Sequence, residues 1–147
     1  MSDVFPQVRQ VIWIRVGALG DLLVSTEALR ATEERFPNAQ IWILGSKLWL
    51  ELINPDLWPR VSGIIELIGR GKGQFYRPAL DSFGARQNMW TTYEEPRGLG
   101  YFYRKADACV NLRIESYRYA WGPFLNRVPI RVGSCAPAMK WLYTHWF

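Results

Sequence analysis

The feature that most constrains the fold is an apolar run near the N-terminus that ends at a pair of glycines. Residues Val11 to Val16 read V-I-W-I-R-V, and Gly17 and Gly20 follow. A short β-branched and aromatic run that stops at glycine predicts a buried strand entering a tight turn. The spacing of apolar residues over 21–36 then predicts one helix, with Glu33 facing solvent. A strand joined to a helix by a tight turn is the start of an α/β unit.

The same alternation continues through the first half of the chain. Residues 41–44 form a second predicted strand, residues 46–53 a short helix, and residues 61–68 a third strand. Helices that connect consecutive strands imply a parallel sheet with right-handed connections. Regularity returns at Asp107, where residues 108–112 are predicted as a strand, 115–125 as a helix and 129–132 as a short strand.

Two segments of the second half are harder to place. Residues 69–104 interleave glycines, aromatics and arginines without periodicity, and they predict an irregular insertion that packs on a partner. Met139, Leu142, Tyr143 and Trp146 follow helical spacing, so a C-terminal helix is expected, which either docks on the sheet or begins a further unit. The length of 147 residues fits a single domain, residues 1–147.

Charge is distributed unevenly along the chain. Residues 1–68 hold six Lys or Arg against eight Asp or Glu, whereas residues 69–147 hold twelve against five. A basic half suits phosphate groups or an anionic membrane, or it is simply a solvated basic surface. Nucleic acid is not expected as a partner, because no nucleic-acid-binding signature appears. With no secretion signal or membrane span, we expect a cytoplasmic protein, or one peripheral at the cytoplasmic face of a membrane.

The residues that metal sites and nucleophilic dyads require are scarce. His145 is the only histidine, and the two cysteines are Cys109 and Cys135. Cys109 lies in a predicted buried strand, and neither cysteine belongs to a Cys-x-x-Cys pair or a zinc spacing. No metal site is therefore predicted, and both cysteines suit a reducing compartment.

The turn after the first strand is the best candidate for chemistry. In open α/β sheets ligands bind outside the carboxyl ends of strands, and glycines allow the backbone to approach them closely. The start of the helix favours an anion. Gly17 and Gly20 do not have the dinucleotide-binding spacing, and the lysine of a P-loop is absent. Asp21 has two interpretations, which are a general base for a sugar hydroxyl and a residue that caps the helix.

These residues resemble a known family. The stretch I-R-V-G-A-L-G-D-L-L-V-S-T-E-A-L-R-A-T (14–32) is similar to the N-terminal half of the family 9 glycosyltransferases, the ADP-heptose:lipopolysaccharide heptosyltransferases. The similarity continues at F-P-N-A-Q-I (36–41) and I-N-P-D (53–56), and then at A-D-A-C-V-N-L-R (106–113), P-I-R-V-G-S (129–134) and L-Y-T-H (142–145).

The resemblance implies a Rossmann-like domain, one half of the GT-B architecture, and inverting, metal-independent sugar transfer. The catalytic base of the family matches Asp21. The resemblance also implies an anionic glycolipid acceptor, held by the first turn and by the end of the fourth strand. The residues expected to bind it are Arg15, Gly17, Ala18, Gly20, Arg113 and Ser116.

The chain also departs from the family pattern. Glu27 stands where the family usually has proline, and Asn111 and Arg113 stand where it usually has Asp and Gln. The donor-binding half is absent, so no cofactor is expected, and a nucleotide sugar such as ADP-heptose would bind only with a donor domain supplied in trans. The chain alone is expected to be inactive. The alternative is a non-catalytic subunit of a larger assembly, whose protein partner contacts residues 69–104 and the C-terminal helix.

Overall fold

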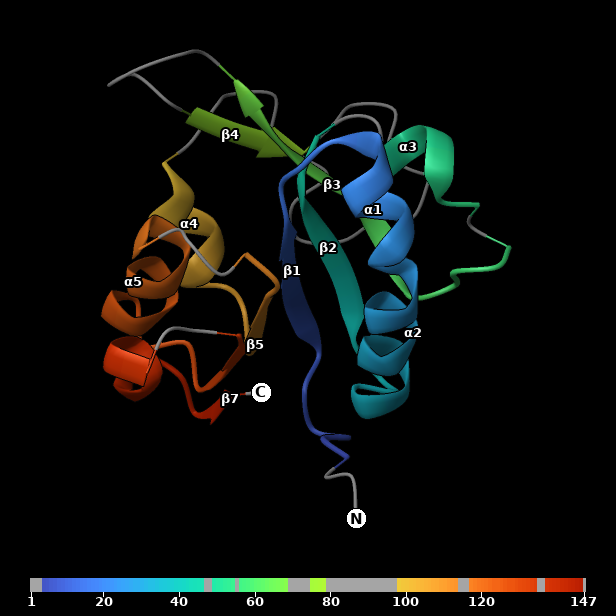
Figure 1. The fold of residues 1–147 in the computed structure, drawn as a ribbon. Helices are drawn as coiled ribbons and strands as arrows, with labels where there is room; N and C mark the ends of the chain where they lie inside the picture. Colours follow the sequence, from blue (N-terminus) through green and yellow to red (C-terminus); the bar gives the residue numbers. More distant parts are fainter. Residues whose placement is uncertain are drawn as a thin grey trace.

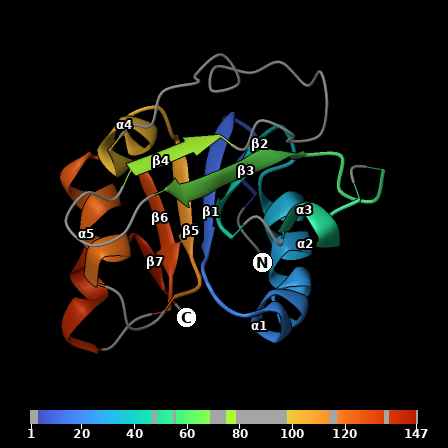
Figure 2. The same cartoon turned by 90° about the horizontal axis from the view of Figure 1, so that it is seen from above.

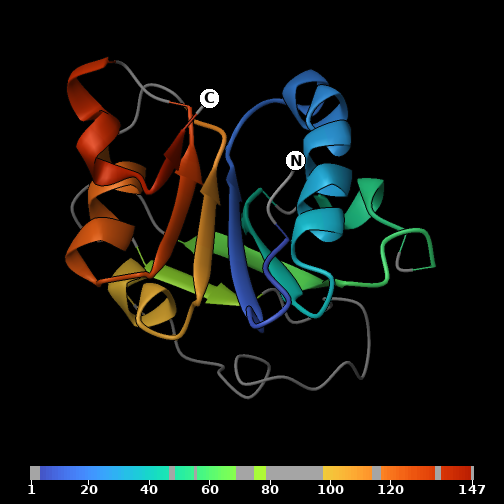
Figure 3. The ribbon, with the colours of Figure 1, turned by 90° about the horizontal axis from the view of Figure 1, so that it is seen from below.

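The computed structural model describes residues 4–46, 49–54, 56–68, 75–78, 98–113, 117–134 and 137–146. These residues form three layers, with a central sheet between two sets of helices (Figure 1 and, from below, Figure 3). In chain order the elements are β1 (Gln10–Arg15), α1 (Leu19–Val24), α2 (Thr26–Arg35), β2 (Gln40–Gly45), α3 (Trp49–Leu52), β3 (Val61–Ile68), β4 (Phe75–Pro78), α4 (Leu99–Tyr103), β5 (Ala108–Asn111), α5 (Tyr117–Leu125), β6 (Ile130–Gly133), the 3₁₀ helix η2 (Pro137–Leu142) and β7 (His145–Trp146).

The sheet that the described residues build has seven strands, in the order β4-β3-β2-β1-β5-β6-β7 (Figure 2). Every neighbouring pair is parallel except β3 and β4, which are antiparallel. Helices α1, α2 and α3 lie on one side of the sheet, and α4 and α5 lie on the other. The predicted fold class, a Rossmann-like parallel sheet flanked by helices, is confirmed.

Strand β1 is buried on both of its faces. Val11 and Trp13 pack with α1, α2 and α3, whereas Ile12 and Ile14 pack with α4 on the opposite face. All four side chains are fully buried. Side chains of a strand alternate between the two faces, so a strand covered on both sides must be apolar at every position. This explains why the residues from Val11 to Ile14 are apolar without interruption.

The single helix predicted over residues 21–36 is in fact two helices. It begins two residues earlier, at Leu19, and is interrupted at Ser25 between α1 and α2. The Ser25 hydroxyl donates a hydrogen bond of 2.6 Å to the carbonyl of Asp21, and such back-bonding bends helices. The expectation that Glu33 faces solvent is also wrong. Glu33 is buried, and its Oε1 accepts a hydrogen bond from the backbone N–H of Arg60 at 3.2 Å.

The predicted C-terminal helix is present only in part, as a 3₁₀ helix that ends at Leu142, and its predicted continuation to Trp146 is wrong. The segment forms η2 and then the short strand β7, which pairs with β6. Thr144 fixes this arrangement through the backbone of Arg131 in β6. The N–H and the hydroxyl of Thr144 both donate to the Arg131 carbonyl, and the Arg131 N–H donates to the Thr144 hydroxyl. Met139 and Leu142 are buried against Ala120 of α5. The segment therefore docks on the domain, which was one of the two outcomes expected.

Part of the segment predicted as irregular, residues 69–104, is regular. Strand β4 extends the sheet, and Phe102 and Tyr103 of α4 are buried in the core. The rest of that segment, residues 69–74 and 79–97, lies outside the described residues. Within the described ranges no helix is both long enough and apolar enough to cross a membrane.

Candidate functional site

Strand order reverses between β1 and β5. From β1 the chain proceeds through β2 and β3 toward one edge of the sheet, whereas β5, β6 and β7 proceed toward the other. Neighbouring strands then send their following loops in opposite directions, which leaves a crevice at their carboxyl ends where α/β proteins bind ligands. The two segments that leave this point are the β1–α1 turn, residues 15–21, and the residues after β5.

The β1–α1 turn places a carboxylate at the start of α1. Ala18 has an extended conformation (φ −74°, ψ 167°), and its carbonyl accepts the N–H of Leu22, so Ala18 is the residue at which the helix begins. The Oδ2 of Asp21 accepts a hydrogen bond from the Ala18 N–H at 3.3 Å. Asp21 therefore does cap the helix, from its first turn rather than from the N-cap position. The anion that the helix start favours is the side chain of Asp21 itself.

Arg15 holds the other oxygen of the same carboxylate. Its Nη2 lies 3.4 Å from Asp21 Oδ1, and its Nε donates a hydrogen bond of 2.9 Å to the hydroxyl of Ser25. The side chain of Arg15 is 19% exposed, whereas that of Asp21 is 54% exposed. Arg15 thus reaches across the turn and fixes Asp21, and one side of the carboxylate remains open to solvent. No sequence pattern points to Ser25, because its role depends on the interruption of the helix.

The two glycines of the turn have different environments. A Cβ on Gly17 would lie 2.7 Å from Asp21 Oδ2, so a side chain there would displace the carboxylate. A Cβ on Gly20 would meet nothing within 4 Å. The fold therefore requires a glycine at position 17, where Asp21 packs, and leaves room for a side chain at Gly20, while the close approach of a ligand to either glycine stays a prediction.

Arg113 connects the end of β5 to the β1–α1 turn. Its Nη1 donates a hydrogen bond of 3.0 Å to the carbonyl of Val16, and its backbone N–H donates to Asn111 Oδ1 at 2.9 Å. The structure therefore brings Arg113 together with the turn that holds Arg15 and Asp21, as the sequence analysis expects. Ser116, predicted to line the same cleft, lies outside the described residues.

Two buried residues that the sequence analysis did not predict support this arrangement. Trp49 of α3 donates its indole N–H to the carbonyl of Arg15 at 3.3 Å. Asn111 donates its side-chain N–H to the hydroxyl of Tyr143 at 2.8 Å. Asn111 thus links the loop that carries Arg113 to the C-terminal segment. No sequence motif marks either contact: Trp49 belongs to an apolar segment, and Asn111 stands out only as a departure from the family pattern, with no partner predicted for it.

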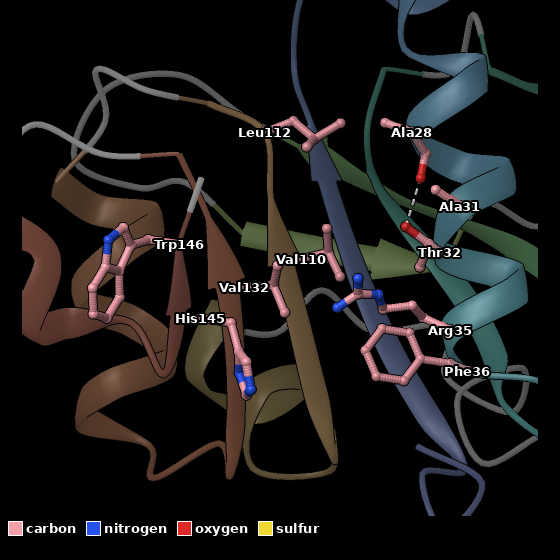
Figure 4. Close-up of a pocket in the computed structure, with 10 residues that line it drawn as sticks. All are labelled: Ala28, Ala31, Thr32, Arg35, Phe36, Val110, Leu112, Val132, His145 and Trp146. Carbon is pink, nitrogen blue, oxygen red and sulfur yellow. Dashed lines mark hydrogen bonds between the residues drawn. The ribbon is translucent and has the colours of Figure 1, made fainter. Parts of the chain in front are cut away.

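An apolar groove of about 300 Å³ lies elsewhere, between α2 and the strands β5, β6 and β7 (Figure 4). None of the predicted site residues lines the described part of this groove, so it is separate from the turn. His145 lines it, and its ring packs edge-on against Phe5 with centroids 5.5 Å apart. Cys109 is buried, as expected, and this burial raises the pKa of its thiol. Cys135 lies outside the described residues. The described residues form no cluster suited to a metal ion.

Comparison with known proteins supports the fold. No protein-family model matches the chain, and no curated protein matches it. Among solved structures, the chain is similar to the glycosyl transferase family 9 protein from Veillonella parvula DSM 2008, with a TM-score of 0.60 and 16% sequence identity. The match covers 100% of this chain and 36% of that one. The chain therefore has a fold like that of a family 9 glycosyl transferase and spans 36% of the length of that structure.

Proposed function

We propose that this chain is the acceptor-binding part of an inverting, heptosyltransferase-like glycosyltransferase. Asp21 accepts the proton of the acceptor hydroxyl as that hydroxyl attacks the sugar of a nucleotide sugar such as ADP-heptose. The nucleotide sugar is bound by a separate donor-binding region, so the chain alone transfers no sugar. The similarity in fold to a family 9 glycosyl transferase, over 36% of that structure, is consistent with such a division of labour.

The observation that carries the proposal is the geometry of Asp21. A general base must reach the hydroxyl oxygen at about 2.6–3.2 Å and must hold a fixed orientation. Arg15 and the Ala18 N–H fix the two oxygens of Asp21, while 54% of the side chain stays accessible at the carboxyl edge of β1. A carboxylate whose only role was to cap α1 would not need a cation as well to orient it.

The same edge suits an anionic acceptor. Arg15 and Arg113 bring two guanidinium groups to the β1–α1 turn, which also carries the carboxylate of Asp21. Only Arg15 of these two contacts that carboxylate, and Arg113 instead contacts the Val16 carbonyl. Guanidinium groups bind phosphate and carboxylate in a planar, two-point geometry. We therefore propose that Arg113 contacts the phosphates or acidic sugars of a lipopolysaccharide-core-type acceptor.

Binding of an acceptor to the purified chain tests this function. The probe is a phosphorylated lipopolysaccharide-core oligosaccharide, titrated by calorimetry. We expect Arg113→Ala to weaken binding by about tenfold or more, as charge-assisted hydrogen bonds do when removed. Arg9→Ala is the matched control, because it removes an exposed arginine at the opposite end of β1. Equal affinity of the wild-type chain and Arg113→Ala, with both folded, would contradict the assigned site.

A turnover assay tests the division of labour. The purified chain is given ADP-heptose and the same oligosaccharide, and the product is followed by mass spectrometry. We expect no transfer by the chain alone, and transfer when a donor-binding region of a family 9 glycosyl transferase is supplied. Transfer by the chain alone would contradict the need for a donor region. If no acceptor binds at all, the chain is not an acceptor domain.

A further inference from the structure

The outer surface of α5 and η2 exposes a cluster of aromatic and aliphatic side chains, which we call the aromatic patch: Trp121, Phe124, Leu125 and Trp141. The rings of Trp121, Phe124 and Trp141 contact one another edge to face, with centroids 5.1 to 5.8 Å apart. Leu125 is 68% exposed, Trp141 55% and Trp121 37%. Large apolar side chains that gather in this way on a surface mark a site of interaction.

The position of the aromatic patch separates it from the candidate site. It lies on the side of the sheet that carries α4 and α5, whereas α1 and α2 lie on the other (Figures 1 and 3). The aromatic patch is built by two elements that pack on each other through Ala120 and Met139. It is therefore a preformed part of the fold, and an occupant of the β1–α1 turn does not cover it.

The stretch of sequence that carries the aromatic patch has charged residues of one sign only. Residues 116–147 contain three arginines and one lysine and no acidic residue. Lys140 is exposed beside Trp141 in sequence, and its Nζ lies 5.5 Å from the ring centroid of Trp146, which is itself 52% exposed. Arg131 lies over the ring of Phe124 at 5.6 Å, and Arg127 is exposed just beyond the end of α5.

The combination of exposed aromatic rings and neighbouring cations indicates what the aromatic patch binds. Tryptophan prefers the interface between lipid headgroups and acyl chains, where its ring is in apolar surroundings and its edge is near water. Lysine and arginine beside it are attracted to anionic headgroups. Lysine is depleted in the cores of protein interfaces, so the exposed Lys140 beside Trp141 favours a lipid surface over a protein partner. We propose that the aromatic patch binds the surface of an anionic lipid bilayer, with the rings inserted among the headgroups and the cations on the phosphates.

Vesicle binding by the full 147-residue chain tests the proposal. The purified protein is sedimented with vesicles of phosphatidylglycerol and phosphatidylethanolamine, and in parallel with vesicles of phosphatidylcholine alone. We expect binding to the anionic vesicles that weakens as salt is added, because salt screens the attraction between the cations and the headgroups. Equal binding to both kinds of vesicle, or binding to neither, overturns the proposal. A stable complex with an acidic protein and no binding to vesicles would assign the patch to a protein partner instead.

Two substitutions locate the binding surface. Lys140→Glu is expected to lower the affinity for anionic vesicles by about tenfold or more, since it removes a cation and adds an anion. Trp141→Ser is expected to lower it by about tenfold through the loss of inserted apolar area. The matched controls are Arg30→Glu on α2 and Leu57→Ser, both exposed residues outside the patch. Circular dichroism verifies that each variant folds, and an equal loss of binding in the controls overturns the assignment to this patch.

The outcome is independent of the proposed function. The vesicles contain no sugar acceptor, and none of the four substitutions alters a residue of the β1–α1 turn. A wild-type chain that binds the oligosaccharide but not the anionic vesicles would therefore overturn the membrane proposal alone. A wild-type chain that binds the anionic vesicles but not the oligosaccharide would overturn the assignment of the acceptor site alone.

Discussion

The β1–α1 turn and the C-terminal segment, α5 to β7, use their polar and apolar side chains in opposite ways. In the turn, Arg15 and Ser25 are largely buried and bond to each other and to Asp21, whose side chain is 54% exposed. In the C-terminal segment, the aromatic rings of Trp121 and Trp141 contact each other yet remain exposed. The turn presents one oriented carboxylate, whereas the C-terminal segment presents an exposed apolar surface. The first arrangement suits the proposed catalysis, and the second suits the proposed binding to a lipid surface.

The largest expected effect comes from Asp21→Asn. The amide keeps an oxygen that can accept the Ala18 N–H, but it cannot accept a proton from a sugar hydroxyl. In the chain complemented by a donor-binding region, we expect the rate of sugar transfer to fall by a factor on the order of 10²–10⁴, the usual contribution of a positioned base. The measurement is kcat, with the melting temperature followed alongside it.

Glu27→Gln is the control for that substitution, since Glu27 is an exposed acid on the neighbouring helix α2. It should leave kcat unchanged. If Asp21→Asn lowers only the melting temperature and leaves kcat intact, Asp21 is a helix-capping residue and the turn loses its catalytic assignment.

Asn111 joins the two regions, and its substitution tests how far they depend on each other. It is 1% exposed, and it bonds both to the Arg113 backbone and to the Tyr143 hydroxyl. Asn111→Ala leaves these groups without their partner, so we expect a loss of about 2–3 kcal/mol in the free energy of unfolding. Tyr143→Phe should cost less, about 1 kcal/mol, since a single hydroxyl is removed. Urea unfolding measures both.

A double-mutant cycle on Asn111 and Tyr143 sharpens the result. Coupled partners give a double variant that is less destabilised than the sum of the single ones. Strict additivity would show that the turn and the C-terminal segment are energetically independent, despite the 2.8 Å contact.

The first half of the fold was predictable from sequence because it follows local rules. Strand β1 has a run that must be apolar at every position, and the glycines after it end the strand. The C-terminal segment was not predictable in the same way. Its helical spacing covers only a few residues, and the outcome depends on Thr144 bonding to Arg131, which is distant in sequence. Tertiary hydrogen bonds there decide a conformation that local preference leaves open.

In the candidate site too, features set by local sequence were predictable and those set by tertiary contacts were not. Asp21 and the turn were predicted from position and from a resemblance, and the structure places Arg113 beside that turn. Ser25, Trp49 and Asn111 were missed, because each acts through a contact made only after the chain has folded. Glu33 was assigned to solvent from its charge, yet it is buried against Arg60.

Glu33 lies outside both regions and provides a reference for pH dependence. Burial raises the pKa of Glu33 above 4.5, although the Arg60 N–H and the charges of Arg60 and Arg30 oppose this shift. A raised pKa in the folded state favours the protonated form, so its contribution to stability is fully present below about pH 4.5 and is lost as pH rises through the folded value. Glu33→Gln should therefore gain stability relative to the wild-type chain as pH rises from acid to neutral. Chemical denaturation at several pH values measures this, and a pH-independent difference would mean that another group dominates.

The smallest expected effect is a change in stability at Gly20, which distinguishes it from Gly17, the other glycine of the turn. Gly20 lies within α1 with open space around it, so Gly20→Ala should stabilise the fold by about 0.5–1 kcal/mol, because alanine favours a helix more than glycine does. A Cβ on Gly17 would meet Asp21 Oδ2, so Gly17→Ala should displace the carboxylate and reduce sugar transfer. If Gly20→Ala is stabilised and yet also loses acceptor binding, the open space at Gly20 is where the acceptor approaches the backbone. If it binds acceptor as the wild-type chain does, the acceptor site lies on the side of Asp21 that faces Arg113.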